Sequence, residues 1–175
     1  LATLISWAPN SRLKDTNDIL FVWIPKNSGS TVYRELREAL GMQNIHRPNR
    51  WQRFPGRGAV TTGHVSLKSL MDEGHVPKEY VNRAYKFAIV RNPYSRIVSL
   101  YNYSKRYGFT SAKSFASFLD DIDSRIEPVG LYNQKGMSQA NTQCAWIFDE
   151  LGQLLVDDLF RLENLDELSQ NLLRR

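Results

Sequence analysis

The residues best suited to chemistry in this sequence lie in a short segment, residues 25–31, which reads Pro-Lys-Asn-Ser-Gly-Ser-Thr. An apolar run precedes the segment and an amphipathic stretch follows it, so it should join a strand to the start of a helix. The first amides of a helix attract anions. Gly29 lets the backbone approach an oxyanion closely, Lys26 adds a cation, and Ser30 and Thr31 add hydroxyl donors. The segment therefore predicts a phosphate-binding loop.

The position of the lysine distinguishes this loop from the one in nucleotide triphosphatases. A Walker-type loop reads G-x-x-x-x-G-K-[ST], with its lysine directly before the helix. Here Lys26 comes directly after the apolar run and precedes Gly29. This order argues against a Walker-type ATPase. Taken alone, the segment leaves open an ordinary helix cap beside an exposed lysine.

A second candidate anion site lies in residues 87–101, which read Phe-Ala-Ile-Val-Arg-Asn-Pro-Tyr-Ser-Arg-Ile-Val-Ser-Leu-Tyr. Arg91 follows a predicted strand, and Pro93 suits the first turn of a helix. Ligands of open α/β sheets bind beyond the carboxyl ends of the strands, so Arg91 should direct its guanidinium toward such a ligand. Alone, it could equally be a surface ion-pair residue. We expect Arg96 to be an exposed helix charge.

Hydrophobic periodicity predicts strands that alternate with helices. We expect strands over residues 18–24 and 85–90, and helices over 31–40, 93–104, 114–121 and 166–175, the last cut short. Residues 44–63 should form an irregular basic connection, and 149–152 a hairpin turn. The alternation predicts an α/β fold with a mainly parallel sheet.

The composition is that of one ordinary globular domain over residues 1–175, with 42% hydrophobic and 23% charged residues. A net charge of +5 suits an anionic ligand and nucleic acid equally. The single cysteine, Cys144, excludes an internal disulfide and a multi-cysteine zinc site, and we expect it to be buried. We find no stretch of the length and apolarity that a membrane span requires.

Together, the two segments resemble the sulfotransferases that use 3′-phosphoadenosine-5′-phosphosulfate (PAPS), particularly the carbohydrate sulfotransferase branch and its bacterial relatives. In that family a P-K-x-x-G-[ST]-[ST] loop binds the 5′-phosphosulfate. A strand ending V-R-[ND]-P, with a serine eight residues after the arginine, binds the 3′-phosphate. Residues 25–31 match the first motif, and Arg91 and Ser99 match the second, about 65 residues further on. The resemblance extends over residues 19–168 and includes the segments 63–66 and 161–165.

The resemblance implies a P-loop NTPase-like three-layer sandwich, with a mainly parallel central sheet flanked by helices. It implies metal-free transfer of a sulfuryl group from PAPS to a hydroxyl or amine, with 3′,5′-ADP as the product. Lys26 would be catalytic, because it would stabilise the bridging oxygen of the leaving group. The implied cofactor-binding residues are Lys26, Asn27, Ser28, Gly29, Ser30, Thr31, Arg91 and Ser99.

A hydroxyl acceptor must also lose a proton, and His64 is the predicted catalytic base because imidazole titrates near neutrality. Several carbohydrate sulfotransferases place a catalytic histidine in a G-H-V-S stretch such as residues 63–66. Some relatives have H-x-H there, whereas this chain has Thr62 at the first position. A purely structural role for His64 in its loop stays open, and Glu35 is an alternative base.

The implied acceptor is a glycan or a small molecule, and we expect neither a nucleic-acid partner nor a membrane segment in this chain. The lack of a disulfide and the bacterial relatives favour a cytoplasmic location. The alternative is a protein of the Golgi lumen, or one anchored in a membrane, whose anchor has been removed.

Two other function classes stay open at this point. A P-loop kinase would need magnesium and a nucleoside triphosphate, and the lysine position argues against it. A non-catalytic polyanion-binding module would use the arginines at 47, 50, 53 and 57, and its affinity would fall steeply with salt. A degenerate sulfotransferase that binds cofactor without transferring sulfate is a variant of the main hypothesis.

Overall fold

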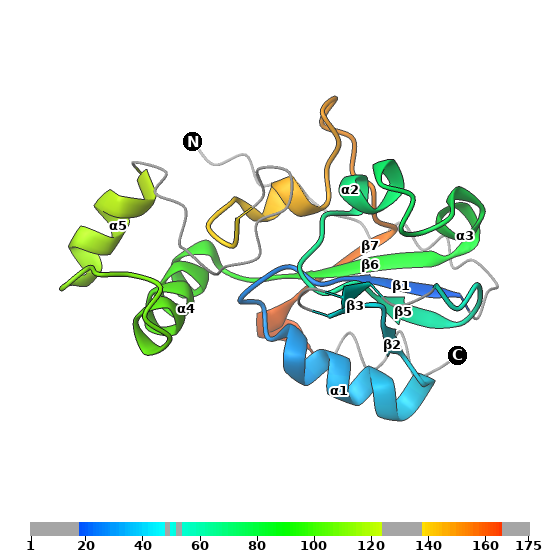
Figure 1. Cartoon of the computed structure of the whole chain (residues 1–175), viewed down its shortest axis with the longest axis horizontal. Helices are drawn as coiled ribbons and strands as arrows, with labels where there is room; N and C mark the ends of the chain where they lie inside the picture. Colours follow the sequence, from blue (N-terminus) through cyan, green and yellow to red (C-terminus); the bar gives the residue numbers. More distant parts are fainter. Residues whose placement is uncertain (1–17, 48–49, 52–53, 124–137, 166–175) are drawn as a thin grey trace.

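The computed structural model describes residues 18–47, 50–51, 54–123 and 138–165, and the final predicted helix lies outside them. A five-stranded sheet with the order β2-β5-β1-β6-β7 forms its centre, and every neighbouring pair is parallel (Figure 1). In chain order these strands are β1 (Ile19–Val22), β2 (Gln43–Asn44), β5 (Ala59–Thr61), β6 (Tyr85–Val90) and β7 (Asp158–Arg161). The predicted α/β class and parallel sheet are confirmed. A short antiparallel pair, β3 (His46–Arg47) and β4 (Arg50–Trp51), lies outside this sheet.

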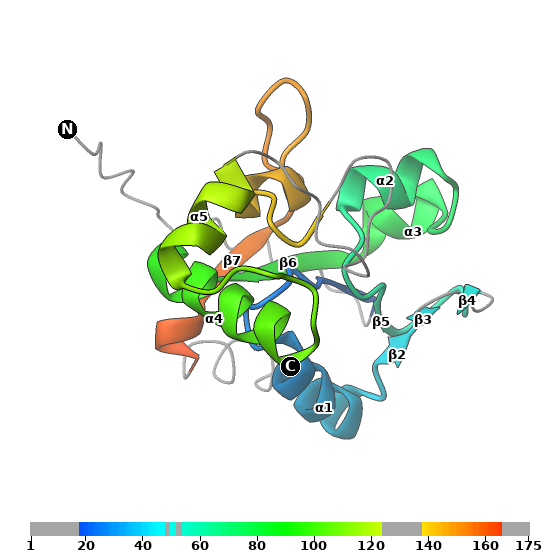
Figure 2. The same ribbon diagram turned by 60° about the vertical axis from the view of Figure 1, so that its left-hand side comes forward.

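Helices cover both faces of the sheet, as a three-layer sandwich requires (Figure 1). The helix α1 (Gly29–Leu40) lies on one face, and α2 (Leu67–Asp72) and α3 (Lys78–Arg83) lie on the other. Two further helices, α4 (Pro93–Arg106) and α5 (Phe115–Asp123), pack together to one side of the sheet (Figure 2). Short 3-10 turns span Gln143–Trp146 and Leu162–Asn164.

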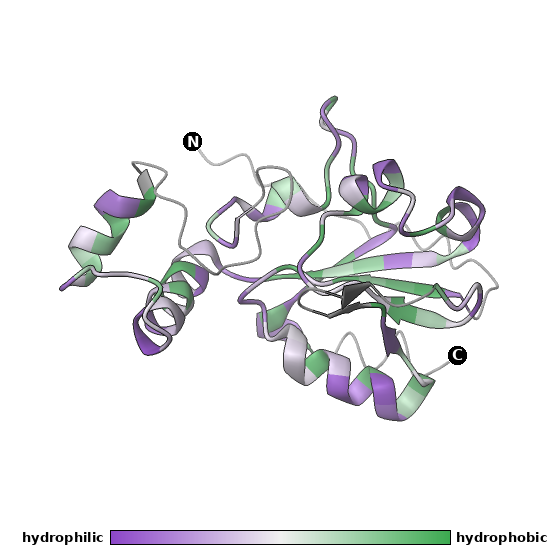
Figure 3. Ribbon diagram, in the orientation of Figure 1, coloured by the Kyte–Doolittle hydropathy of each residue, from purple (hydrophilic) through white to green (hydrophobic). Residues whose placement is uncertain are grey.

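The core is divided by the alternation of side chains along β1. Leu20 and Val22 join the cluster under α2 and α3, whereas Ile19 and Phe21 join the one under α1. Both sets are buried, because a parallel sheet is covered on both faces. Figure 3 shows apolar residues along the strands and polar residues on the outer helices.

The structure corrects the sequence prediction at several elements. The segment 44–63 is not irregular throughout, since β5 pairs directly with β1. This strand has only three residues and follows a glycine-rich turn, so its apolar run is too short to recognise. In α5, whose apolar residues we expected to be buried, Phe118 is buried but Leu119 is 40% exposed. The predicted hairpin turn is confirmed by the antiparallel bridge between Phe148 and Leu154.

A buried carboxylate ties together the amino ends of the central strands. Asp18 is 3% exposed and accepts hydrogen bonds from Arg83, from Arg57 at 3.2 Å and from the Gly58 amide at 2.6 Å. Burial alone would raise the pKa of Asp18, but the hydrogen bonds from Arg83 and Gly58 and the positive charge nearby hold it below its ordinary value. The contacts connect β1 to α3 and to the turn before β5.

Asp18→Asn should lower the free energy of unfolding at neutral pH by about 3 kcal/mol, because it leaves Arg83 without its counter-charge. A depressed folded-state pKa adds stability that is lost as pH falls through that pKa, so the deficit of the variant should shrink on acidification. Urea unfolding at several pH values measures both effects. Arg34→Gln, which breaks an exposed pair with Glu35, is the control and should change stability by less than about 1 kcal/mol. Equal effects of the two variants would contradict the prediction.

Candidate active site

The phosphate loop, residues 25–31, follows β1 and leads into α1 at the carboxyl edge of the sheet (Figure 1). Lys26 and Ser28 have positive φ angles, 68° and 58°, which are uncommon outside glycine. Such a backbone turns successive N–H groups toward one side and forms an anion-binding concavity. The Ser28 carbonyl accepts hydrogen bonds from Thr31 and Val32 and so closes the first turn of α1.

Gly29 is required by a neighbouring side chain that no sequence motif indicated. A Cβ atom at this position would lie 1.8 Å from Nε1 of Trp23, so the indole occupies the space of any side chain. Trp23 also stacks on Tyr33 of α1, with ring centroids 5.6 Å apart. The indole therefore packs the loop against its own helix, and only glycine fits between them.

A cavity of about 430 Å³ lies beside the phosphate loop. Every predicted site residue except Asn27 and Thr31 lines it, although these residues come from three separate segments of the chain. Trp23, Tyr103 and Gln139 complete the lining, and no sequence motif indicated them. The lining residues are Trp23, Lys26, Ser28, Gly29, Ser30, His64, Arg91, Ser99, Tyr103 and Gln139.

Asn27 and Thr31 belong to the phosphate loop but do not line the cavity. The Asn27 side chain is buried and donates hydrogen bonds to the Ile89 carbonyl at 2.7 Å and to Gln143 Oε1 at 2.8 Å. Its contact with a ligand could therefore come only from its backbone. Thr31 is exposed on the first turn of α1.

Two cations approach each other in the cavity. The Nζ atom of Lys26 lies 4.0 Å from the centre of the Tyr103 ring, and Arg91 donates a hydrogen bond to the Lys26 carbonyl at 3.2 Å. Burial lowers the pKa of Lys26, and the charge of Arg91 lowers it further. An anion bound between the two side chains would relieve this repulsion.

His64 contacts the backbone of Trp23 through one ring nitrogen: its Nδ1 atom is 3.3 Å from the Trp23 carbonyl oxygen. A carbonyl oxygen only accepts hydrogen bonds, so this contact requires the proton on Nδ1. In the neutral ring, Nε2 then carries the lone pair. The imidazole also packs edge-on against the indole, with centroids 5.4 Å apart. These two contacts hold the orientation of the imidazole and favour the tautomer with its proton on Nδ1.

Arg91 and Ser99 are placed by the connection from β6 to α4. Asn92 caps the helix, because its Oδ1 accepts from the amides of Tyr94 and Ser95 at 3.0 and 3.2 Å. The proline at the first helical position was predicted correctly. Ser99 then faces the cavity two turns into α4.

The prediction that Arg96 is an exposed charge is wrong. Arg96 is only 6% exposed and donates to the carbonyls of Pro25, Gln139 and Asn141 at 3.1, 2.8 and 3.0 Å. Burial lowers the pKa of its guanidinium to about 10. Because its partners are backbone carbonyls far away in sequence, no local pattern indicated this role.

Several other residues weighed in the sequence have structural or surface roles. Arg57 pairs with Asp18, and Glu35 is exposed beside Arg34. Cys144 is exposed, contrary to the prediction, because it lies on a short 3-10 turn rather than on a buried strand.

Neither a metal site nor a membrane span is found among the described residues. In that part of the chain, no group of three or more His, Cys, Asp or Glu side chains could hold a metal ion. None of the helices described there is long and apolar enough to cross a membrane.

Comparison with known proteins identifies the family. The family model described as "Sulfotransferase family" matches residues 9–171, which contain the phosphate loop, His64, Arg91 and Ser99. Comparisons with curated proteins and with solved structures found no match. The family match covers nearly the whole chain, and the α/β fold with its parallel sheet agrees with the sulfotransferase fold. The chain therefore belongs to the sulfotransferase family and is a PAPS-dependent transferase.

Proposed function

We propose that this protein transfers the sulfuryl group of PAPS to a hydroxyl of a carbohydrate, with 3′,5′-ADP as the second product. The observation that carries the proposal is that Lys26, His64, Arg91 and Ser99 all line the same cavity. Its volume of about 430 Å³ is in the range of small-ligand sites.

The donor groups in the cavity fit a nucleotide with phosphates at both ends of its ribose. The phosphate loop offers amides, the Ser30 hydroxyl and the Lys26 ammonium for the 5′-phosphosulfate. Arg91 and Ser99 offer a guanidinium and a hydroxyl for the 3′-phosphate. The bound donor supplies the sulfuryl group, and the chain supplies fixed positive charge around it.

Two side chains would act in the transfer itself. As the acceptor oxygen bonds to sulfur and the bond from sulfur to the bridging oxygen breaks, Lys26 stabilises the charge that grows on that bridging oxygen. Nε2 of His64 accepts the proton that the acceptor hydroxyl loses. The contact between Nδ1 and the Trp23 carbonyl holds the ring in the tautomer for this step.

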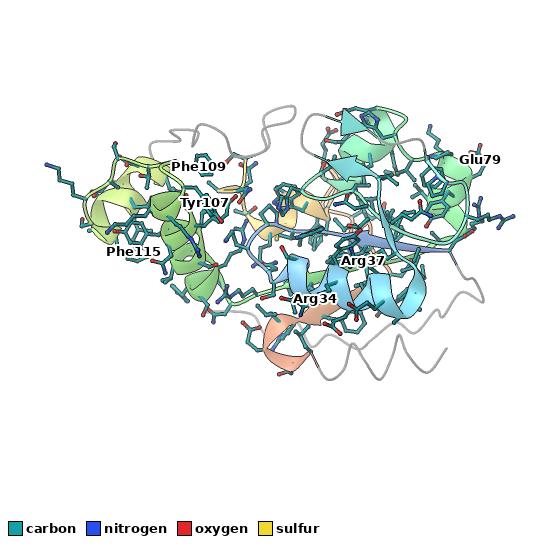
Figure 4. All side chains as sticks on the ribbon, turned by 60° about the horizontal axis from the view of Figure 1, so that its bottom comes forward. Arg34, Arg37, Glu79, Tyr107, Phe109 and Phe115 are labelled. Atoms are coloured by element: carbon teal, nitrogen blue, oxygen red, sulfur yellow. The ribbon has the colours of Figure 1, made fainter. Side chains whose placement is uncertain are left out.

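The carbohydrate acceptor is supported by an aromatic surface next to the cavity. Ser99, Tyr103 and Tyr107 follow one another at intervals of four residues, so they share one face of α4 and its end. The rings of Tyr103, Tyr107 and Phe109 are 4.7 to 6.1 Å apart, and Tyr107 is 56% exposed. Figure 4 shows Tyr107 and Phe109 beside α4. Half-exposed rings of this kind suit the apolar face of a sugar ring.

Lys26→Met should lower kcat for sulfuryl transfer by about 10²–10³-fold, because one charged donor to the leaving oxygen is lost. This kcat is measured from the transfer of radiolabelled sulfate from PAPS to a panel of glycans and small alcohols, in the presence of EDTA. Arg37→Gln, which removes an exposed cation from α1, the helix that follows the phosphate loop, is the control and should leave kcat unchanged (Figure 4). Stabilisation of the wild type by magnesium and ATP, but not by 3′,5′-ADP, would instead support a kinase.

His64→Asn should lower kcat by about 10²–10⁴-fold and leave the affinity for 3′,5′-ADP nearly unchanged, because the base contacts the acceptor rather than the nucleotide. Transfer assays combined with calorimetry of 3′,5′-ADP binding separate the two quantities. Unchanged kcat in a folded His64→Asn variant would leave the histidine with a structural role only.

Tyr107→Ala should raise KM for a glycan acceptor by about fivefold without changing KM for PAPS, since a lost aromatic contact is worth about 1 kcal/mol. Tyr94→Ala is the matched control, because Tyr94 is a more exposed tyrosine, 80%, on the same helix. Equal acceptor KM values for both variants would remove the aromatic surface from the proposal.

A further inference from the structure

Gln143 joins the two anion-binding elements of the cavity without lining it. Its Oε1 atom accepts hydrogen bonds from the Asn27 side chain at 2.8 Å and from the Arg91 amide at 2.9 Å. Its Nε2 atom donates to the Arg91 carbonyl at 2.7 Å. The Gln143 side chain thus binds both the backbone amide and the backbone carbonyl of Arg91, and it also binds the phosphate loop through Asn27.

The link continues through Asn27 into the sheet. Asn27 is 1% exposed, and its Nδ2 atom also donates to the carbonyl of Ile89, two residues before Arg91. Asn27 and Gln143 therefore fasten the middle of the phosphate loop to the end of β6. Because these bonds lie between buried or half-buried groups, their loss would not be replaced fully by water.

The segment that carries Gln143 is itself anchored. The buried guanidinium of Arg96 donates to the carbonyls of Gln139 and Asn141, four and two residues before Gln143. The same guanidinium donates to Pro25, the first residue of the phosphate loop. Residues 139–143, which we call the brace, are thereby bonded to both the phosphate loop and α4.

We propose that Gln143 is a positioning residue, which sets the separation between the phosphate loop and Arg91 and so makes the site selective for a nucleotide with both 5′- and 3′-phosphates. The inference rests on the proposed function, since it assumes that the phosphate loop and Arg91 bind opposite ends of one nucleotide. A rigid separation allows both phosphates to bind at once without a further ordering cost. If the link were loose, a 5′-monophosphate would bind almost as well as the bisphosphate.

The test is the ratio of two dissociation constants, that of AMP over that of 3′,5′-ADP, measured by calorimetry without magnesium. In the wild type the ratio should be large, because the 3′-phosphate adds charge-assisted bonds. In Gln143→Leu, which removes all three bonds at similar volume, the ratio should fall by about tenfold, with a smaller change in AMP affinity. Gln143→Glu keeps an oxygen that can accept the hydrogen bond from Asn27, so the ratio should fall less than in Gln143→Leu.

Gln153→Leu is the matched control, because Gln153 is an exposed glutamine in the turn after the brace. It should leave the ratio unchanged. Thermal melts establish that each variant folds, and Gln143→Glu serves where Gln143→Leu does not fold. A merely structural role of Gln143 would weaken both nucleotides equally, so an unchanged ratio in a folded Gln143 variant would overturn the inference.

The outcomes for the wild type separate this inference from the proposed function. If the wild type binds 3′,5′-ADP no better than AMP, the proposed function fails and the role of Gln143 fails with it. If the wild type shows the preference and the Gln143 variants retain it, only the role of Gln143 is overturned.

Discussion

The parallel pairing of β1 with β6 is the contact on which the site depends. Their register sets Phe21 opposite Phe87 and Val22 opposite Ala88, so the two strands end at the same edge of the sheet. The phosphate loop leaves β1 at this edge, and Arg91 follows β6 there. Groups suited to binding anions, about 65 residues apart in the chain, therefore border one cavity. A change in this register would separate them.

Electrostatics explains why such a site suits a strongly anionic ligand. The ammonium of Lys26 is partly buried and lies near the guanidinium of Arg91, and both effects lower the pKa of the lysine. Without an anion, the arrangement costs free energy. A nucleotide that carries phosphates near both cations reverses the cost, because opposite charges favour the charged form of each group. Arg96 and Gln143 donate hydrogen bonds to the carbonyls of Pro25 and Arg91, and so anchor the backbone that carries the two cations.

Sequence patterns predicted the parts of the fold that are local. The strand over residues 85–90 and the helix from Pro93 are found as predicted, because a buried apolar run and a helix-starting proline act within a few residues. The helix α1 begins at Gly29 rather than at Thr31, since the loop closes its first turn through Ser28. The three-residue strand β5 was missed because its apolar run is too short.

The parts that could not be predicted depend on contacts between distant segments. Arg96 is buried only because carbonyls 71, 43 and 45 residues away meet at its guanidinium. A helical pattern alone places such a cation in solvent. Gln143 and Trp23 likewise gain their roles from neighbours brought together by the sheet. The phosphate loop and Arg91 could be recognised because their motifs carry the chemistry in the sequence itself.

A crystal structure with 3′,5′-ADP tests the central claim most directly. The account predicts the 5′-phosphate on the amides of the phosphate loop, with Lys26 turned toward it, and the 3′-phosphate on Arg91 and Ser99. A nucleotide bound elsewhere, or bound with Lys26 still over the Tyr103 ring and Arg91 without a phosphate contact, would contradict it.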